Sequence, residues 1–514
     1  MQGLREHRRF FLWVGLAGLA LRLFFFIYLP DLTDDSRVYL DLASNWLAHG
    51  VYGQTESGQI VASDTRLPGY PAFLAAIFWV FGVGKIRAVL LAQILFDLGS
   101  CLLIADLARR VVARRWAGRV AFLLAALCPF LANYAVAVLT ETLEVFFTAL
   151  ALDCAVAALD RASDGAGRAP WSLWAATGAS IAVCTLLRPD GGILLAAVAL
   201  YVAAAGRKGA FGLRPGSASL ERCPDTKLEA RHDTRMEQRD AKQQGVVAET
   251  FPGKRVRPFR ALVIAEVTII ILALAPLVPW TVRNWTMLHQ FQPLAPRYAT
   301  GTEEVVPLGF NRWVRTWMAD YTSVEEIYWN VPGEKIDAQK LPARALDSAK
   351  DATLALLADY NVDQRLTPQI DARFDQLARQ RIRARPFRYY VELPLARIAD
   401  MWLRPRTELL PSDTRWWEFN DDPKWSALAV GFGVINLFFL TAAGLALMWR
   451  RASIRYIGLL AGFVVLRSAF LGSIENPETR YTLECYPAII VLASAWIAGW
   501  IEGREAAALT VRAG

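Results

Sequence analysis

Long apolar runs separated by short polar stretches dominate the chain. Ten of these runs are long enough, or nearly so, to cross a hydrocarbon layer of about 30 Å as helices. The pattern therefore predicts an all-α polytopic membrane protein with about 10–11 transmembrane helices, the boundaries shifting by a few residues. The predicted crossings are 10–29, 86–108, 117–134, 138–158, 171–187, 190–205, 260–282, 426–449, 454–473 and 483–501.

One further apolar run, "PGYPAFLAAIFWVFGVG" at 68–84, is short and rich in glycine and proline. An ordinary crossing there would place the basic stretch "ARRVVARR" outside the cytoplasm, against the usual distribution of positive charge. We therefore interpret this run as re-entrant or interfacial, a membrane-lying element in the first outer loop.

Composition agrees with a membrane class, because 54% of the 514 residues are hydrophobic and only 20% are charged. The net charge of +8 lies largely in loops beside the predicted crossings, where it sets orientation and gives no reason to expect nucleic acid as a partner. The six cysteines are scattered and form no metal-binding spacing.

Basic clusters mark the cytoplasmic ends of the crossings. On the path through the membrane that they predict, the chain has three parts. Residues 1–283 form an N-terminal transmembrane module with a polar cytoplasmic loop at 206–258, whose mixed charges are typical of a solvated linker. Residues 284–425 form an outer helical segment, and residues 426–514 form C-terminal transmembrane helices. Within the outer segment, arginines mixed with aromatic residues near 385–404 fit either a helix on the membrane surface or a packed face.

Charged and aromatic side chains gather where the crossings meet the outer side. Asp34 and Asp35 follow the first crossing, and Arg66 precedes the rigid turn "LPGYP". Each has an ordinary alternative, because aspartates cap helices and interfacial arginines anchor to headgroups. Their convergence favours catalysis, with a carboxylate as general base and arginines that hold a phosphate. The set also includes Tyr39, Glu141, Arg188, Arg283, Glu478, Arg480 and Tyr481.

Six short motifs follow one another along the chain: "DSRVYLDLASNWLAHGVYG", "TRLPGYPAFLA", "LTETLEVFF", "LLRPDGG", "PWTVRNW" and "ENPETRYTLECYP". This ordered series resembles the bacterial membrane glycosyltransferases of the GT-C fold, relatives of aminoarabinose transferase and of the dolichyl-phosphate-mannose protein mannosyltransferases. The resemblance implies a GT-C fold and an inverting enzyme that moves a sugar from a polyprenyl-phosphate carrier to a lipid, glycan or protein. It also implies a multi-pass protein of the bacterial cytoplasmic membrane with its active site facing the periplasm or exterior.

The resemblance also implies roles for single residues. Asp35 lies four residues before Tyr39, as the proposed base of the family does, and Asp34 is the second choice. Arg66 matches the basic residue that binds the carrier phosphate, and Arg283 is a second phosphate ligand. The turn "RLPGYP" and the Asp34-Asp35-Ser36 order depart from the common family forms and leave the sugar undefined. The substrate pocket is expected to contain Tyr39, Glu141, Arg188, Glu478, Arg480 and Tyr481.

The expected partners are the polyprenyl-phosphate-linked sugar donor and membrane lipids. The sequence contains no P-loop and no Rossmann fingerprint, in keeping with a donor that is not a nucleotide. We assign no metal ligand and no certain cofactor, although some relatives use a divalent ion, so metal dependence stays open.

Two other functions remain as alternatives. A transporter or flippase would use ionisable residues inside the membrane, and Asp97, Asp153, Glu266 and Arg467 lie in or near apolar runs. A non-catalytic scaffold would anchor the outer segment, and it predicts that Asp35→Asn and Arg66→Ala leave function intact.

Overall fold

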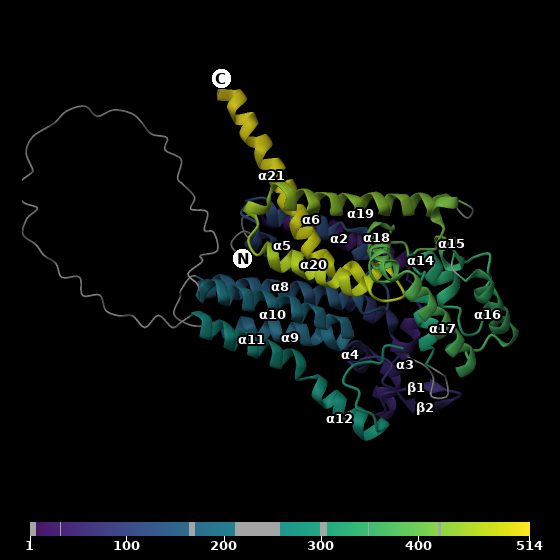
Figure 1. The fold of residues 1–514 in the computed structure, drawn as a ribbon. Coiled ribbons are helices and arrows are strands. Elements are labelled where there is room, and N and C mark those ends of the chain that lie inside the picture. Colours follow the sequence, from purple (N-terminus) through teal and green to yellow (C-terminus); the bar gives the residue numbers. More distant parts are fainter. Residues whose placement is uncertain are drawn as a thin grey trace, which may run out of the picture.

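The computed structural model describes residues 7–30, 32–163, 170–210, 258–298, 306–347, 349–419 and 423–513. Helices dominate these ranges, and the sheet within them is a two-stranded hairpin (Figure 1). Most of the cytoplasmic loop predicted at 206–258 lies outside the described residues, so its predicted character stays a prediction.

Seven helical stretches within the described ranges are long and apolar enough to cross a membrane, so the chain is a multi-pass membrane protein. Large apolar side chains are exposed on these helices, as Leu95 (70%) illustrates, which suits contact with lipid. Four shorter apolar helices accompany them. The seven stretches are Arg8–Tyr28, Ile86–Val111, Glu141–Ala162, Pro189–Gly206, Arg260–Leu288, Pro423–Trp449 and Thr479–Thr510.

The bundle is built around α8, which packs between α5 and α9, and α21 packs against α5, α6 and α19. Short helices η1, η5 and η6 connect its members. The helices of the bundle are α2 (Arg8–Tyr28), α5 (Ile86–Val111), α6 (Ala117–Ala126), α7 (Pro129–Tyr134), α8 (Glu141–Ser163), α9 (Trp171–Leu187), η1 (Pro189–Gly191), α10 (Gly192–Ala210), α11 (Pro258–Leu274), α12 (Leu277–Leu288), α19 (Pro423–Trp449), η5 (Arg451–Ser453), α20 (Ile457–Gly472), η6 (Thr479–Cys485) and α21 (Tyr486–Ala513).

Two predicted crossings differ from the observed helices. The run at 117–134 is divided into α6 and α7, because Pro129 cannot continue the hydrogen-bond ladder of α6. The run at 260–282 is divided in the same way into α11 and α12, where Pro276 precedes Leu277. Hydrophobic periodicity predicted the apolar length of both runs but not these breaks.

The first loop contains two helices and the hairpin. Helix α3 (Asp34–His49) ends at Gly50, whose φ of 70° favours glycine. Strands β1 (Gly53–Glu56) and β2 (Gln59–Ala62) pair antiparallel, with Gly53 opposite Ala62. Helix α4 (Gly69–Phe81) has 13 residues, about 20 Å at 1.5 Å per residue, so it is too short to cross the membrane alone.

Residues 306–419 form a helical segment with a core of its own. Phe310, Trp313, Trp317, Tyr360 and Phe374 are almost completely buried in it. Two short π-helices, η2 and η3, interrupt its α-helices. The elements are α13 (Leu308–Arg315), α14 (Tyr321–Ser323), η2 (Val324–Tyr328), α15 (Ala343–Leu346), α16 (Lys350–Asp363), α17 (Pro368–Ala384), η3 (Arg388–Glu392), α18 (Leu393–Leu403) and η4 (Trp416–Glu418).

Arg397, the arginine of α18, distinguishes the two environments predicted for this stretch, the membrane surface and a packed face. Arg397 is 1% exposed and donates to three backbone carbonyls, including that of Gly472 at the end of α20. It is therefore packed against protein rather than extended to a membrane surface. Phe387 and Leu395 are 65% and 60% exposed, so an apolar face remains open beside it.

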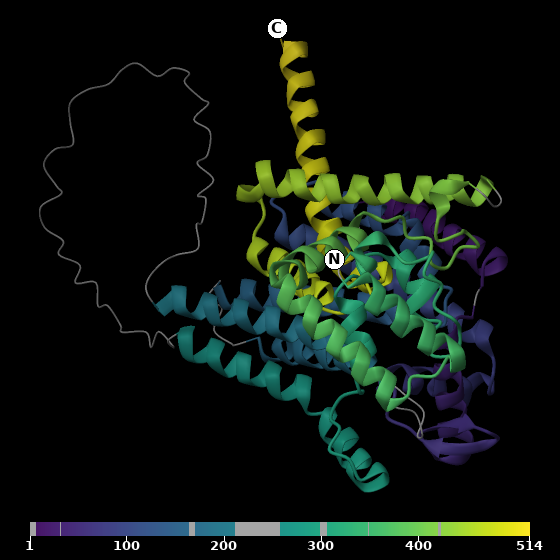
Figure 2. The same cartoon turned by 45° about the vertical axis from the view of Figure 1, so that its right-hand side comes forward.

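The helical segment and the first loop lie at the same end of the bundle. Figure 1 shows α3, the hairpin and α12 at the same end of the bundle as α14 and α17, and the turned view of Figure 2 agrees. Helix α8 begins here at Glu141, and the turns that follow α9 and precede α21 reach the same place. This end therefore brings together the polar motifs that are scattered along the sequence.

Candidate active site

The start of α3 fixes the position of Asp35. Thr33 is the N-cap: its hydroxyl accepts from the Ser36 amide at 3.3 Å, while Ser36 Oγ accepts from the Thr33 amide at 3.2 Å. The alternative in which Asp34 or Asp35 caps the helix is therefore wrong. Asp34 lies in the first turn with a side chain that is 97% exposed and pairs with Arg37. Asp35 is left free to contact distant residues.

Two arginines from opposite ends of the chain hold Asp35. Arg66 Nη2 lies 2.7 Å from Asp35 Oδ1, and Arg480 Nη2 lies 2.8 Å from Asp35 Oδ2. Burial raises the pKa of Asp35, but the charges of Arg480 and Arg66 outweigh it and lower the pKa below its usual range. Asp35 is thus ionised and a weak base while both arginines contact it.

Arg480 is the centre of the cluster. Its Nε donates to Glu478 Oε2 at 2.5 Å, and its Nη1 lies 3.7 Å from Glu141 Oε1. Glu478 is itself fixed by the hydroxyl of Tyr481 and by Asn476 Nδ2 at 3.0 Å. The carboxylates thus point the guanidinium group at Asp35, which keeps Arg480 in one orientation.

Arg188 extends the cluster toward the bundle. It follows α9 and places Nη1 at 3.6 Å from Glu141 Oε1 and Nε at 3.2 Å from Asp190 Oδ1. Its guanidinium carbon lies 4.2 Å from the centre of the Tyr481 ring, a cation–π distance. The second carboxylate oxygen of Glu141 is buried and has no hydrogen-bond partner among the described residues.

Tyr39 lies one turn after Asp35 and packs beneath Arg66. The Arg66 guanidinium carbon is 5.8 Å from the centre of the Tyr39 ring, and that ring meets Tyr70 edge to face at 5.0 Å. Tyr70 in turn donates its hydroxyl to Gln93 on α5 at 2.6 Å. These aromatic contacts fix the first loop to the bundle at the site.

Arg283 lies apart from the Asp35 cluster. Its Nη1 donates to the carbonyl of Ser63 at 2.8 Å and its Nη2 to the carbonyl of Tyr52 at 2.5 Å. Tyr52 then donates its hydroxyl to the carbonyl of Arg66 at 2.9 Å. Arg283 therefore supports the backbone that carries Arg66, and Asp34 likewise stays outside the cluster.

The sequence interpretation missed a second layer of buried charges. Arg467 donates to Asp190 Oδ2 at 2.8 Å and to Glu484 Oε1 at 2.5 Å, and Glu144 lies 3.7 Å from Arg188. Helical spacing could have indicated part of this layer, since Glu144 is three residues after the predicted Glu141. Asp190 stands inside the motif "LLRPDGG", but no spacing rule pairs it with Arg467.

The carboxylates of the site contact arginines rather than one another. Asp35, Glu141 and Glu478 each lie within ion-pair distance of Arg480. In the part of the chain that the structure describes, no group of three or more His, Cys, Asp or Glu residues is placed to hold a metal ion.

A family model described as dolichyl-phosphate-mannose-protein mannosyltransferase matches residues 65–213. The archaeal oligosaccharyltransferase AglB from Archaeoglobus fulgidus, solved with an inhibitory peptide and a dolichol-phosphate, has a similar structure with a TM-score of 0.50 and 10% identity. The superposition covers 99% of this chain and 52% of AglB, so this chain spans about half the length of that protein.

ArnT from Cupriavidus metallidurans, solved bound to undecaprenyl phosphate, is 13% identical, and the superposition covers 96% of this chain and 78% of ArnT. Its TM-score of 0.32 is too low to support the fold assignment. A comparison with curated proteins gives no match. The match over residues 65–213 and the fold shared with AglB agree with the resemblance of the motifs, and the chain has the GT-C fold.

Proposed function

We propose that the protein is an inverting glycosyltransferase that moves a sugar from a polyprenyl-phosphate carrier to an acceptor at the outer face of the bacterial cytoplasmic membrane. One observation carries the proposal: Asp35 lies between Arg66 and Arg480, each within hydrogen-bond distance. Displacement of a phosphate requires a base for the attacking group and cations for the leaving group. The fold shared with AglB, which was solved with a dolichol-phosphate, supports this donor class.

Binding of the donor phosphate activates Asp35 in this mechanism. Arg66 and Arg480 each present one Nη2 to a separate oxygen of Asp35. A phosphate offers these guanidinium groups a stronger, bidentate partner than a shared carboxylate does. When both arginines turn to the phosphate, Asp35 loses its two cations and its pKa returns toward the usual range. The base thus gains basicity only when the donor is bound.

The chemical step is a single in-line displacement. Asp35 accepts the proton of the acceptor hydroxyl or amine while the oxygen or nitrogen of that group attacks C1 of the sugar. The bond from C1 to the acceptor forms while the bond from C1 to the phosphate oxygen breaks, which inverts the anomeric centre. Polyprenyl phosphate leaves with the electron pair of that bond, and Arg66 and Arg480 stabilise the charge that it gains.

The remaining predicted residues position these groups. Glu478 and Glu141 hold Arg480, and Arg188 and Tyr481 form a wall of the same site. Arg283, which the motif proposes as a second phosphate ligand, acts on Arg66 through the backbone that it supports. The hydrogen bonds of Arg283 to the Ser63 and Tyr52 carbonyls favour this indirect role.

Charge distribution supports an outward-facing site. Arg109 and Arg110 lie in the last turn of α5, and Arg455 pairs with Asp160 near the end of α8. Because arginine is enriched at cytoplasmic ends, this end of the bundle belongs in the cytoplasm. Glu141 begins α8 at the opposite end, so the Asp35 cluster faces the periplasm or exterior.

The proposal is tested by donor turnover in membranes that contain the full chain. A panel of polyprenyl-phosphate sugars is supplied, and released polyprenyl phosphate is measured. The wild type is expected to consume at least one donor, and Asp35→Asn to lower the rate about 10²–10⁴-fold. Asp34→Asn is the matched control, because its exposed side chain lies outside the cluster. Failure of the wild type to consume any donor contradicts the proposal, as does an equal rate in Asp35→Asn or a loss confined to Asp34→Asn.

A further inference from the structure

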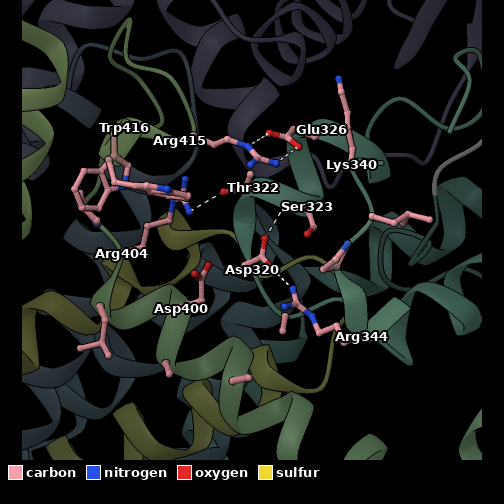
Figure 3. A pocket seen from close by; sticks show the side chains of 18 of the residues that line it. Asp320, Thr322, Ser323, Glu326, Lys340, Arg344, Asp400, Arg404, Arg415 and Trp416 are labelled. Carbon is pink, nitrogen blue, oxygen red and sulfur yellow. Dashed lines mark hydrogen bonds and ion pairs between the residues drawn. The ribbon is translucent and has the colours of Figure 1, made fainter. Parts of the chain in front are cut away.

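A cavity of about 880 Å³ lies in the helical segment, and none of the residues predicted from the motifs lines it. It is bounded by α14, the loop before α15, the last turns of α18 and the residues of η4 (Figure 3). Its volume is within the range of about 300–1,000 Å³ that is usual for small-molecule sites. The cavity is therefore large enough to hold a ligand of several rings.

The charged side chains of this cavity largely neutralise one another. Arg415 makes two hydrogen bonds to Glu326, at 2.7 and 2.9 Å, and Arg344 pairs with Asp320 (Figure 3). Each carboxylate oxygen can accept a second hydrogen bond, so a ligand hydroxyl can bind without breaking these pairs. Because two of the four cations that line the cavity are paired with carboxylates and a third, Arg404, donates to Thr322 and Thr414, the lining suits a ligand rich in hydroxyl groups better than one with strong negative charge.

Two indole rings form one wall of the cavity. The rings of Trp416 and Trp417 lie 5.6 Å apart at 87°, and Trp417 is 48% exposed. The Nε1 of Trp416 is buried and has no hydrogen-bond partner among the described residues. An indole face packs against the C–H face of a sugar ring, and an indole N–H can donate to a sugar hydroxyl.

Other ligand classes fit this lining less well. Alanine, leucine, proline and tryptophan side chains also line the cavity, but a lipid chain would take seven charged side chains out of water without offering them a hydrogen bond. They are Asp320, Glu326, Lys340, Arg344, Asp400, Arg404 and Arg415. An extended peptide is usually bound along a strand edge, and the described part of the segment 306–419 contains no strand. The combination of indoles with paired planar groups therefore favours a saccharide.

The cavity is separated from the Asp35 cluster by one stretch of chain. Arg404 and Pro405 line the cavity, and the next residue, Arg406, donates to the carbonyl of Thr479 at 2.7 Å. Thr479 directly precedes Arg480, which contacts Asp35. A ligand in the cavity would therefore lie one residue along the chain from Arg406, which contacts the start of η6, the short helix that carries Arg480.

Tyr321 packs against the stretch that separates the two places. Its neighbours in the sequence, Asp320 and Thr322, line the cavity. The Arg404 guanidinium carbon lies 5.3 Å from the centre of the Tyr321 ring, a cation–π distance, and the Tyr321 amide donates to Asp400 Oδ2 at 2.9 Å. Tyr321 therefore holds Arg404, two residues before Arg406, at the wall of the cavity.

We propose that this cavity binds the saccharide part of the acceptor, so that a glycan rather than a bare lipid or peptide receives the sugar. This inference rests on the proposed function, which it deepens by naming the acceptor class. Trp416 and Trp417 hold the sugar rings by their faces, and the paired arginines and carboxylates bind the hydroxyl groups. The bound glycan extends past the Arg404–Arg406 stretch toward Asp35.

The test measures saccharide binding directly. The full chain in lipid nanodiscs is applied to an array of defined oligosaccharides, and undecaprenyl phosphate binding is measured on the same samples. The wild type is expected to bind at least one oligosaccharide class. Trp417→Ala should weaken that binding about 2- to 10-fold, and Trp416→Ala/Trp417→Ala should abolish it. Tyr390→Ala is the control, because this exposed aromatic residue of the same segment does not line the cavity.

Thermal unfolding of each variant separates a lost site from a lost fold, and Trp417→Phe, which keeps an aromatic face, should retain most of the binding. Wild-type protein that binds undecaprenyl phosphate but no oligosaccharide overturns the inference and leaves the proposed function standing. Oligosaccharide binding that is unchanged in the double variant overturns it as well. Oligosaccharide binding that depends on the tryptophans, without any binding of undecaprenyl phosphate, supports the cavity and contradicts the proposed function.

Discussion

Two groups of charged side chains lie within the same bundle, one between α2 and α5 and one around Asp35. In the first, Arg22 Nε donates to Asp97 Oδ2 at 2.6 Å, and the two side chains are 0% and 3% exposed. Arg22 also donates to the carbonyls of Gly18 and Ala125, at 3.1 and 3.3 Å, and to that of Ala126. Every nitrogen of this guanidinium group is thus satisfied inside the protein.

The Asp35 cluster is arranged differently. Asp35 and Arg66 are 28% and 30% exposed, and three carboxylates compete for Arg480. One oxygen of Glu141 has no partner among the described residues. Buried charge alone therefore does not identify a reaction site. The closed pair joins two helices, whereas the open cluster can exchange its partners with a ligand.

Two of the other charges that a transporter would need, Asp153 and Arg467, resemble the closed pair. Asp153 lies 3.0 Å from Arg110, near the end of the bundle that carries the basic clusters. Arg467 is fully buried and holds both Asp190 and Glu484. These partners satisfy the ionisable groups in place, which favours a structural role over a path for solutes.

The largest effect on stability is expected at the closed pair. Asp97→Leu leaves Arg22 charged and buried without its partner, so it should lower the free energy of unfolding by about 3–5 kcal/mol. The double variant Arg22→Met/Asp97→Leu removes both charges and should recover most of that loss. Chemical unfolding in mixed micelles measures both. A stable but inactive Asp97→Leu protein would show that the closed pair takes part in the reaction.

The affinity for the carrier phosphate should distinguish the role of Arg66 from that of Arg283. A charged hydrogen bond contributes about 1.5–3 kcal/mol, so Arg66→Gln should weaken undecaprenyl phosphate binding about 10- to 150-fold. Arg283→Gln removes bonds to two carbonyls and should lower thermal stability with a smaller effect on affinity. Equal losses of affinity in the two variants would instead make Arg283 a direct phosphate ligand.

The pH dependence of turnover should show the exchange of partners at Asp35. In the free protein, Arg480 and Arg66 overcome the effect of burial and lower the pKa of Asp35. The ionised Asp35 carboxylate therefore stabilises the folded protein at neutral pH. This contribution to the free energy of unfolding is lost as the pH falls through the lowered pKa. Because kcat reports the bound enzyme and kcat/KM the free enzyme, the acidic limb of kcat should lie at higher pH than that of kcat/KM. Coincident limbs would mean that the arginines stay on Asp35.

The smallest effect is expected at the cavity of the helical segment. Burial raises the pKa of Asp400 to about 6, although Arg404 opposes it. A raised carboxyl pKa means that stability is greatest below the usual pKa and falls as the pH rises through about 6. Asp400→Asn should therefore raise Tm by a few degrees at pH 8 and have little effect at pH 4. A lower Tm at pH 8 would indicate that the Asp400 carboxylate is needed in its charged form.

Much of the architecture followed from the sequence because its signals are local. Apolar length predicted the membrane helices, and the arginine clusters indicate their direction across the membrane, which stays a prediction. The motifs indicated Asp35, Arg66 and Arg480, and these three side chains do meet. Their contact was predictable only as convergence on one face, since 445 residues separate Asp35 from Arg480.

The features that the sequence did not reveal depend on packing over long distances. Arg283 carries the signal of a basic residue at a membrane face, and only its contacts with the Ser63 and Tyr52 carbonyls distinguish support from ligand binding. Arg467 appeared to be an isolated charge in an apolar run until Asp190 and Glu484 were placed beside it. The cavity near Trp416 likewise requires the packing of several separate stretches.

A structure of the full chain with undecaprenyl phosphate bound would show directly whether the arginines exchange Asp35 for phosphate. We predict that the phosphate lies between Arg66 and Arg480, that both guanidinium groups contact it, and that the Asp35 carboxylate is released toward the space for the acceptor. A phosphate bound elsewhere, with Asp35 still paired to both arginines, would contradict this prediction.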